Sequence, residues 1–201
     1  MTISWLVLVS NHFKGIKMKF KKILLSLTLV TFTSCAGLKS HKPKLDSTIE
    51  IAKADGMYRI VSIKGESSSM NSILNRDFMN CNSTTFAMPR GNTVVSFIRE
   101  IFENELTVAK KFSMDGEDVS VIVKTINLKT EKNDRGTWTI VMDYIENDKT
   151  KNIETVTSFE SKLSLLSACV NTSNIFEEAL ADNFVEYFKR KNRKIPESVL
   201  K

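Results

Sequence analysis

Histidine and glycine are scarce in this sequence, and their scarcity excludes several kinds of chemistry. The 201 residues include two histidines, His12 and His41, and neither falls within residues 48–201, where a folded domain is predicted. Serine–histidine catalysis, cysteine–histidine catalysis and histidine-rich metal sites therefore have no candidate in that domain. The seven glycines form no phosphate-cradling loop. The sequence therefore predicts neither a metal site nor a bound cofactor.

Long hydrophobic runs are also missing near the N-terminus. The apolar stretch from Ile23 to Phe32 has about half of the roughly 20 residues that a membrane-spanning helix needs. Lysines precede this stretch, and two small residues connect it to Cys35, a pattern typical of a secretory signal. The end of the stretch resembles the lipobox of bacterial lipoproteins, in which the cysteine is diacylated and becomes the mature N-terminus. Phe32 departs from the leucine that is common at this position.

The signal pattern that ends at Cys35 predicts how the chain is organised. We expect a signal peptide over residues 1–34, with translation starting at Met18, a lipid-bearing tether over residues 35–47, and a single α+β domain over residues 48–201. The alternative is that Met1 is the true start and the signal is unusually long. Ala36 resembles the residue that follows the cysteine in lipoproteins sorted to the outer membrane. The predicted location is therefore the bacterial cell envelope, lipid-anchored in the outer membrane and facing the periplasm.

The net charge of +6 comes mostly from the leader. Residues 1–34 contain five lysines and no acidic residue, which leaves 24 basic and 23 acidic residues in the remainder. A nucleic-acid partner would need a basic face on the folded domain, and none is expected. The cationic cluster from Lys189 to Lys194 is predicted to lie at the C-terminal end of a helix, where it suits the helix dipole.

Two cysteines remain if Cys35 carries lipid, namely Cys81 and Cys169. An even pair in an oxidising compartment predicts a disulfide. Such a bridge would close a long loop and would constrain the unfolded state by about 4 kcal/mol in the chain-entropy model. Two buried free thiols are the alternative.

Hydrophobic periodicity predicts an α+β fold, an antiparallel sheet of about four strands with two amphipathic helices packed on one face. Residues 65–91 form the least regular part, with one short strand over residues 84–88 and many turn-forming residues. A helix break is considered near residues 171–174. The predicted strands are residues 57–64, 119–128, 136–145 and 152–161, and the predicted helices are residues 93–111 and 163–191. The residues expected in the core are Phe102, Leu106, Trp138, Ile140, Leu180 and Phe184.

Short motifs from about residue 80 to residue 200 carry a family resemblance. They are Cys81-x4-Phe86-x2-Pro89-x-Gly91-x-Thr93, Phe97-Ile98-x3-Phe102-x2-Glu105-Leu106, Gly136-x-Trp138, Phe159, Ala168-Cys169 and Pro196-Glu197-x2-Leu200. Together they resemble an uncharacterised group of bacterial envelope lipoproteins. The resemblance implies a small α+β domain behind a lipobox-type signal, and it implies no particular activity.

The sequence favours a non-catalytic accessory protein that binds or scaffolds an envelope protein or a glycan, with the membrane contacted through the N-terminal lipid. If the disulfide pins the irregular segment, that segment becomes a rigid platform, and the residues expected to contact a partner are Asn80, Asn82, Phe86 and Arg90. The alternative is a hydrolase that uses two carboxylates on cell-wall or glycan material. Its candidate acids are Glu100 with Glu103, and Asp143 with Glu154 or Glu160.

Overall fold

The structure is a computed structural model that describes residues 42–81, 84–130, 135–160 and 165–193. These residues belong to one compact unit that spans residues 36–201. The predicted signal, Cys35 and most of the tether lie outside the described residues. The elements are α2 (Leu45–Ala52), β1 (Tyr58–Gly65), α3 (Ser68–Leu74), β2 (Phe78–Cys81), β3 (Thr84–Ala87), the 3-10 turn η1 (Pro89–Gly91), α4 (Val94–Val108), β4 (Glu117–Thr130), β5 (Arg135–Glu146), β6 (Lys149–Glu160) and α5 (Leu165–Asn192).

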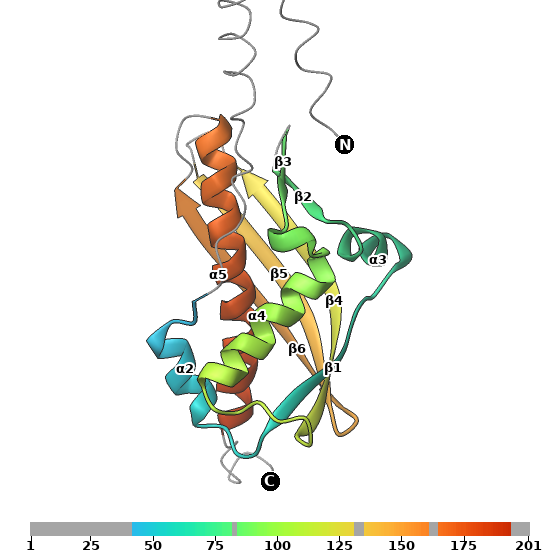
Figure 1. The fold of residues 1–201 in the computed structure, drawn as a ribbon, viewed down its shortest axis with the longest axis vertical. Coiled ribbons are helices and arrows are strands. Elements are labelled where there is room, and N and C mark those ends of the chain that lie inside the picture. Colours follow the sequence, from blue (N-terminus) through green and yellow to red (C-terminus); the bar gives the residue numbers. More distant parts are fainter. Residues whose placement is uncertain (1–41, 82–83, 131–134, 161–164, 194–201) are drawn as a thin grey trace, which may run out of the picture. The chain divides into compact units, whose positions relative to one another are not determined.

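A four-stranded sheet in the order β1-β4-β5-β6 forms one layer, and α4 and α5 cover one of its faces (Figure 1). The three long strands β4, β5 and β6 pair antiparallel, in agreement with the prediction. A separate two-stranded hairpin, β2-β3, lies beside the sheet. The class is α+β, as predicted.

The sheet is mixed, because β1 pairs parallel with β4. The expectation of a fully antiparallel sheet is therefore wrong at this strand. After β1 the chain passes through α3, the hairpin and α4 before it enters β4 from the same end of the sheet. Parallel neighbours need a long crossover of this kind, and the register places Tyr58 opposite Glu117.

The described residues contain two further α-helices besides the two that were predicted. The first, α2, occupies Leu45–Ala52, part of which was expected to be tether; it contacts α5 and α4, and its residue Ile51 is buried. The second, α3, occupies Ser68–Leu74 in the segment that was expected to be a loop. Its serine-rich sequence has little periodicity, but Ser67 caps the helix by accepting a hydrogen bond from the backbone N–H of Met70, at 3.2 Å.

The predicted helix over residues 93–111 is α4, whose N-cap is Thr93. Thr93 and Ser96 form a reciprocal capping box, which satisfies backbone N–H groups that a helix start would otherwise leave unpaired. At the other end of the chain, α5 runs without interruption from Leu165 to Asn192, so the break considered near residue 171 does not occur. Its last turn carries Lys189, Arg190 and Lys191, in agreement with the helix-end role predicted for the basic cluster. In the described residues no helix is both long and apolar enough to cross a membrane.

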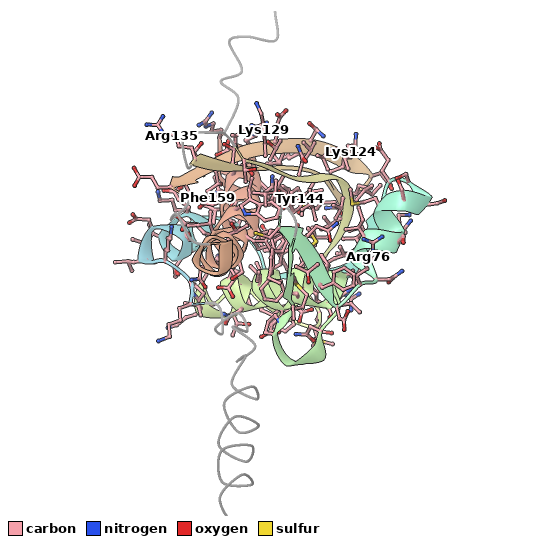
Figure 2. The ribbon with its side chains drawn as sticks, turned by 90° about the horizontal axis from the view of Figure 1, so that it is seen from above. Arg76, Lys124, Lys129, Arg135, Tyr144 and Phe159 are labelled. Carbon is pink, nitrogen blue, oxygen red and sulfur yellow. The ribbon has the colours of Figure 1, made fainter. Side chains whose placement is uncertain are left out.

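The core lies between the sheet and the two long helices. The six residues expected there are all buried, each with 1% or less of its surface exposed. Aromatic rings fill most of this layer: Phe102 stacks on Phe184 with their ring centroids 4.3 Å apart, and Tyr144 stacks on Tyr187 at 4.5 Å. Figure 2 shows Tyr144 inside, between sheet and helices, whereas Lys124 and Lys129 lie on the sheet face that no described helix covers.

Candidate functional site

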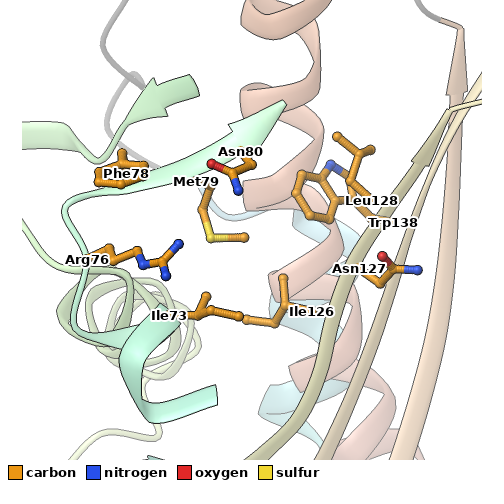
Figure 3. Close-up of a pocket in the computed structure, with 9 residues that line it drawn as sticks. All are labelled: Ile73, Arg76, Phe78, Met79, Asn80, Ile126, Asn127, Leu128 and Trp138. Atoms are coloured by element: carbon orange, nitrogen blue, oxygen red, sulfur yellow. The ribbon is translucent and has the colours of Figure 1, made fainter. Parts of the chain in front are cut away.

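A groove opens between the β2-β3 hairpin, α3 and the distal half of β4 (Figure 3). Its volume is about 340 Å³. Six of its nine lining residues are apolar, and the polar ones are Arg76, Asn80 and Asn127, of which the Asn127 side chain points to the opposite face of β4 (Figure 3). The lining residues are Ile73, Arg76, Phe78, Met79, Asn80, Ile126, Asn127, Leu128 and Trp138.

The groove exists because β1 is shorter than its neighbour β4. Pairing between the two strands ends at Gly65, opposite Val123, whereas β4 stays paired with β5 as far as Thr130. Beyond Val123, no described strand pairs with the β1 side of β4. The side chains of Ile126 and Leu128 project from this part of β4 toward the hairpin and form one wall.

Gly65 ends β1 by close contact with α3. The Asn71 side chain accepts a hydrogen bond from the Gly65 N–H at 2.8 Å and donates one to the Gly65 carbonyl at 3.2 Å. A Cβ atom at Gly65 would lie 2.6 Å from the backbone nitrogen of Asn71, so a larger residue could not occupy this position without moving α3. The Asn71 side chain of α3 thus binds the backbone N–H and carbonyl of Gly65, and β1 ends at this residue.

Arg76 is the one charged side chain that lines the groove in the described residues. Its guanidinium lies 5.7 Å from the centroid of the Phe78 ring, within the range of a cation–π contact. Figure 3 shows the guanidinium directed into the space between the hairpin and β4, with the Ile73 and Ile126 side chains facing each other below it. An apolar floor with one cation and the Asn80 amide at its edge suits an elongated ligand that carries both apolar groups and a negative charge.

The four residues predicted to contact a partner lie in different environments in the structure. Asn80 is exposed and lines the groove. Phe86 is 5% exposed and packs edge-on against Trp138 and Phe176, so its predicted contact with a partner is wrong; it is a core residue. Asn82 and the Arg90 side chain lie outside the described residues. The prediction missed Arg76, Phe78 and the β4 wall, because no local pattern indicates where β1 stops or that the hairpin faces β4.

The predicted Cys81–Cys169 bridge stays a prediction. Cys81 ends β2, is 3% exposed and takes part in an interaction. Cys169 belongs to the first turns of α5, whose side chains lie outside the described ones. The partly apolar hairpin sequence, with Met79 and Phe86 buried, also anchors this segment to the core, so the hairpin has hydrophobic support besides any disulfide.

The bridge can be tested by counting reactive thiols. We expect neither Cys81 nor Cys169 to react with a maleimide–polyethylene glycol reagent in denatured, unreduced protein, and both to react after reduction. Loss of the bridge in Cys81→Ser should lower the free energy of unfolding by about 4 kcal/mol. That variant also serves as the control, because it should expose the Cys169 thiol without reductant. Labelling of both cysteines before reduction would contradict the prediction.

The two helix carboxylates considered for hydrolysis are each engaged by a neighbouring side chain. Glu100 accepts a hydrogen bond from Asn92 at 2.8 Å, and Glu103 forms an ion pair with Arg99 at 3.4 Å. Glu160 lies eight positions beyond the β6 residue that pairs with Asp143, about 26 Å along the strand. Asp143 and Glu160 therefore cannot act on one bond.

Asp143 and Glu154 are diagonal neighbours on the uncovered face of the sheet. Burial alone would raise the pKa of Asp143, but hydrogen bonds from Asn152 at 2.6 Å and from Lys124 at 2.9 Å, with the charge of Lys124, outweigh it and hold that pKa below its ordinary value. A carboxyl group kept ionised in this way is unsuited to the general-acid role that a two-carboxylate hydrolase requires.

A second groove, of about 600 Å³, lies between α2, β6 and α5. Charged residues of both signs line it, including Asp182, whose pKa is raised by burial although the nearby Lys44 charge acts in the opposite direction. Lys44 is also paired with Glu178. Because acids and bases are mixed along this groove, its charge favours no one class of ligand.

Comparisons with known proteins give similarities of fold at low sequence identity. No protein-family model matches the sequence, and no curated protein matches it. Protein XCC0632 from Xanthomonas campestris, of the family model DUF330, superposes with a TM-score of 0.48 at 9% identity, over 67% of this chain and 82% of that one. A candidate lipoprotein from Caulobacter crescentus CB15 gives a TM-score of 0.36 at 10% identity, over 74% and 93% of the two chains. An uncharacterized protein gives 0.37 at 7% identity, over 70% and 92%.

Proposed function

We propose that this protein is a non-catalytic lipoprotein of the bacterial cell envelope, anchored through Cys35, and that its domain holds an extended segment of a partner protein in the groove beside β4. The observation that carries the proposal is the open side of β4 beyond Val123, where a groove with an apolar floor runs along a strand that β1 does not pair. The anchor rests on the signal pattern that ends at Cys35.

An extended peptide fits this place because of the backbone that faces it. The distal part of β4 begins at a register shift between Val123 and Thr125 and stays paired with β5 as far as Thr130. A peptide that adds to such an edge gains main-chain hydrogen bonds for affinity, while pockets for alternate side chains give specificity. Ile126 and Leu128 are two residues apart and face the same side, so they would contact alternate side chains of an added strand.

The positive charge of Arg76 at the edge of the groove restricts which partner segments can bind there. Arg76 would pair with an acidic side chain or with a terminal carboxylate, and the amide of Asn80 can donate to or accept from main-chain groups. The expected partner segment therefore alternates apolar and other residues and carries a negative charge near the Arg76 end. A glycan would use the Asn80 amide but would leave the apolar wall and the strand edge without matching groups.

Site-specific photo-crosslinking in living cells tests the groove. A benzoyl-phenylalanine at Asn80 should form a protein adduct, and the charge reversal Arg76→Glu should abolish that adduct, because both residues line the groove. The control position is Val108, which is 47% exposed at the end of α4 and should give no adduct. With the identified partner purified, amide hydrogen exchange in β4 residues 124–130 should slow on binding.

Three results would contradict the groove as a peptide site. They are the absence of any Asn80 adduct, an adduct that persists in Arg76→Glu, and an adduct that resists protease and is released by a muramidase. The last of these would assign the groove to a glycan.

The anchor is tested separately by metabolic labelling. Cells grown with labelled palmitate should tag the protein, and Cys35→Ala should abolish the label and release a soluble form, because the acyl chains are attached through that cysteine. The matched control is Cys81→Ser, which leaves Cys35 intact and should stay labelled. Label that persists in Cys35→Ala would refute lipidation at this residue.

A further inference from the structure

Helix α2 exposes large apolar side chains on the face that points away from the domain. Leu45 is 74% exposed and Ile49 is 46% exposed, whereas Ile51 and Ala54 are buried at 0% and 2%. Leu45 and Ile49 are one helical turn apart, and the exposed Ala52 continues their stripe. The helix is thus apolar on two sides, although packing on α5 needs only one of them.

Positive charges lie beside this stripe. Lys42 is exposed just before the helix. Lys53 follows the helix with 56% of its side chain exposed and forms an ion pair with Glu50 at 2.6 Å. The two acids of the helix, Asp46 and Glu50, line the second groove on the α5 side. An apolar stripe with lysines at its edges is the arrangement found in helices that lie in the interface of a membrane.

The position of α2 in the chain keeps it close to the membrane in which Cys35 would be anchored. Nine residues separate Cys35 from Leu45, and even a fully extended segment of that length reaches only about 30 Å. Among the described elements, α2 is therefore the one held nearest to the anchor along the chain. Tethering raises the local concentration of the lipid surface around it, so a contact too weak to bind a free protein becomes occupied.

We propose that the exposed face of α2, formed by Leu45, Ile49 and Ala52 and flanked by Lys42 and Lys53, lies in the headgroup region of the membrane that holds Cys35. This inference rests on the lipid anchor of the proposed function. The apolar side chains enter the headgroup and acyl boundary to a depth of about 5–10 Å. The lysines lie at the level of the lipid phosphates and contact anionic headgroups.

This contact would orient the whole domain. In Figures 1 and 2, α2 and α3 lie on opposite sides of the domain. With α2 against the bilayer, α3 and the groove that it borders with β2 and β4 face away from it. A partner segment then reaches the groove from the side remote from the lipid.

Fluorescence quenching in the lipid-anchored full chain tests the contact. The variants Leu45→Trp and Ile49→Trp are purified with their lipid and placed in phosphatidylethanolamine–phosphatidylglycerol vesicles whose acyl chains carry bromine. Both should lose a large part of the added tryptophan emission and shift to shorter wavelength. The matched control is Met114→Trp, an apolar position that is 69% exposed in the turn before β4 and should show neither change. Trp138, which is 1% exposed, supplies a constant background.

The outcomes separate this inference from the anchor on which it rests. Co-sedimentation with vesicles reports on the lipid, whereas bromine quenching reports on α2. Chains that sediment with the vesicles but are unquenched at both α2 positions would overturn the inference and leave the anchor standing. If Met114→Trp were quenched equally, the membrane contact would not be specific to the exposed face of α2, and the inference would be overturned. A blue shift that persists on unbrominated vesicles and depends on protein concentration, without quenching by bromine, would instead assign the face to a second copy of the chain.

Discussion

Replacing Trp138 with alanine is expected to lower the free energy of unfolding by about 3–5 kcal/mol, as for other large aromatic residues truncated in a core. Trp138 is 1% exposed and lies on the inner face of β5. Its ring centroid is 4.8 Å from that of Phe176 and 6.5 Å from that of Phe86. One side chain thus joins the sheet, helix α5 and the β2-β3 hairpin.

The polar group of the indole, which is buried, has a hydrogen-bond partner in α5. Its Nε1–H donates to the Thr172 carbonyl in α5 at 3.1 Å. Alanine at this position would remove that hydrogen bond and leave a cavity under the groove, whose wall includes Trp138. We therefore expect Trp138→Ala also to weaken any adduct formed at Asn80.

Thermal and denaturant unfolding measure the effect, and Thr139→Ala is the matched control. Thr139 is the next residue on β5 and faces away from the helices, so its loss should change stability by no more than about 0.5 kcal/mol. For a domain of this size, 3–5 kcal/mol corresponds to a fall in melting temperature of roughly 10 °C or more. A Trp138→Ala protein that melts within a degree or two of the parent would show that the ring is not a core anchor.

The second large effect is expected at Asn183, a buried amide that fastens α5 to the sheet. Asn183 is fully buried. The two hydrogens of its Nδ2 are shared among three acceptors, namely the Ile140 carbonyl at 3.1 Å, the Ile153 carbonyl at 3.3 Å and the Thr155 hydroxyl at 3.0 Å. Its Oδ1 accepts from the Tyr144 hydroxyl at 2.9 Å.

Replacing Asn183 with alanine should cost about 3–4 kcal/mol, since each net hydrogen bond contributes about 1 kcal/mol and buried partners left unsatisfied cost more. Burial raises the pKa of Tyr144 well above its ordinary value, so its phenol stays protonated and keeps its role as donor. The double-mutant cycle of Asn183→Ala with Tyr144→Phe should therefore show a coupling energy of roughly 0.5–3 kcal/mol.

The control for Asn183 is Asn174→Ala on the same helix. Asn174 is exposed, and alanine there should change stability by no more than about 0.5 kcal/mol or should stabilise the helix slightly. Additive single variants, with no coupling between Tyr144 and Asn183, would argue against a shared polar network at this position.

Local sequence patterns are sufficient to predict several features of this fold. Alternation along β5 placed Trp138 and Ile140 inside, and helical spacing placed Phe102 and Phe184 inside. The start of the predicted helix over residues 93–111 is also a local feature, because the capping of α4 by Thr93 involves residues three positions apart. Each of these features depends on neighbours within one or two turns, so the sequence is sufficient to predict them.

Tertiary structure alone decided where β1 pairs, what the segment over residues 65–91 forms and where the groove lies. The turn-rich sequence after Gly65 has little periodicity, and its helix and hairpin are fixed by packing: Asn71 binds Gly65, and Phe86 enters the core beside Trp138. The groove needs β1 to stop at Gly65 while β4 continues to Thr130. That difference in strand length relates residues more than 50 positions apart. It depends on which surfaces are buried together in the folded protein, and local propensity does not encode this.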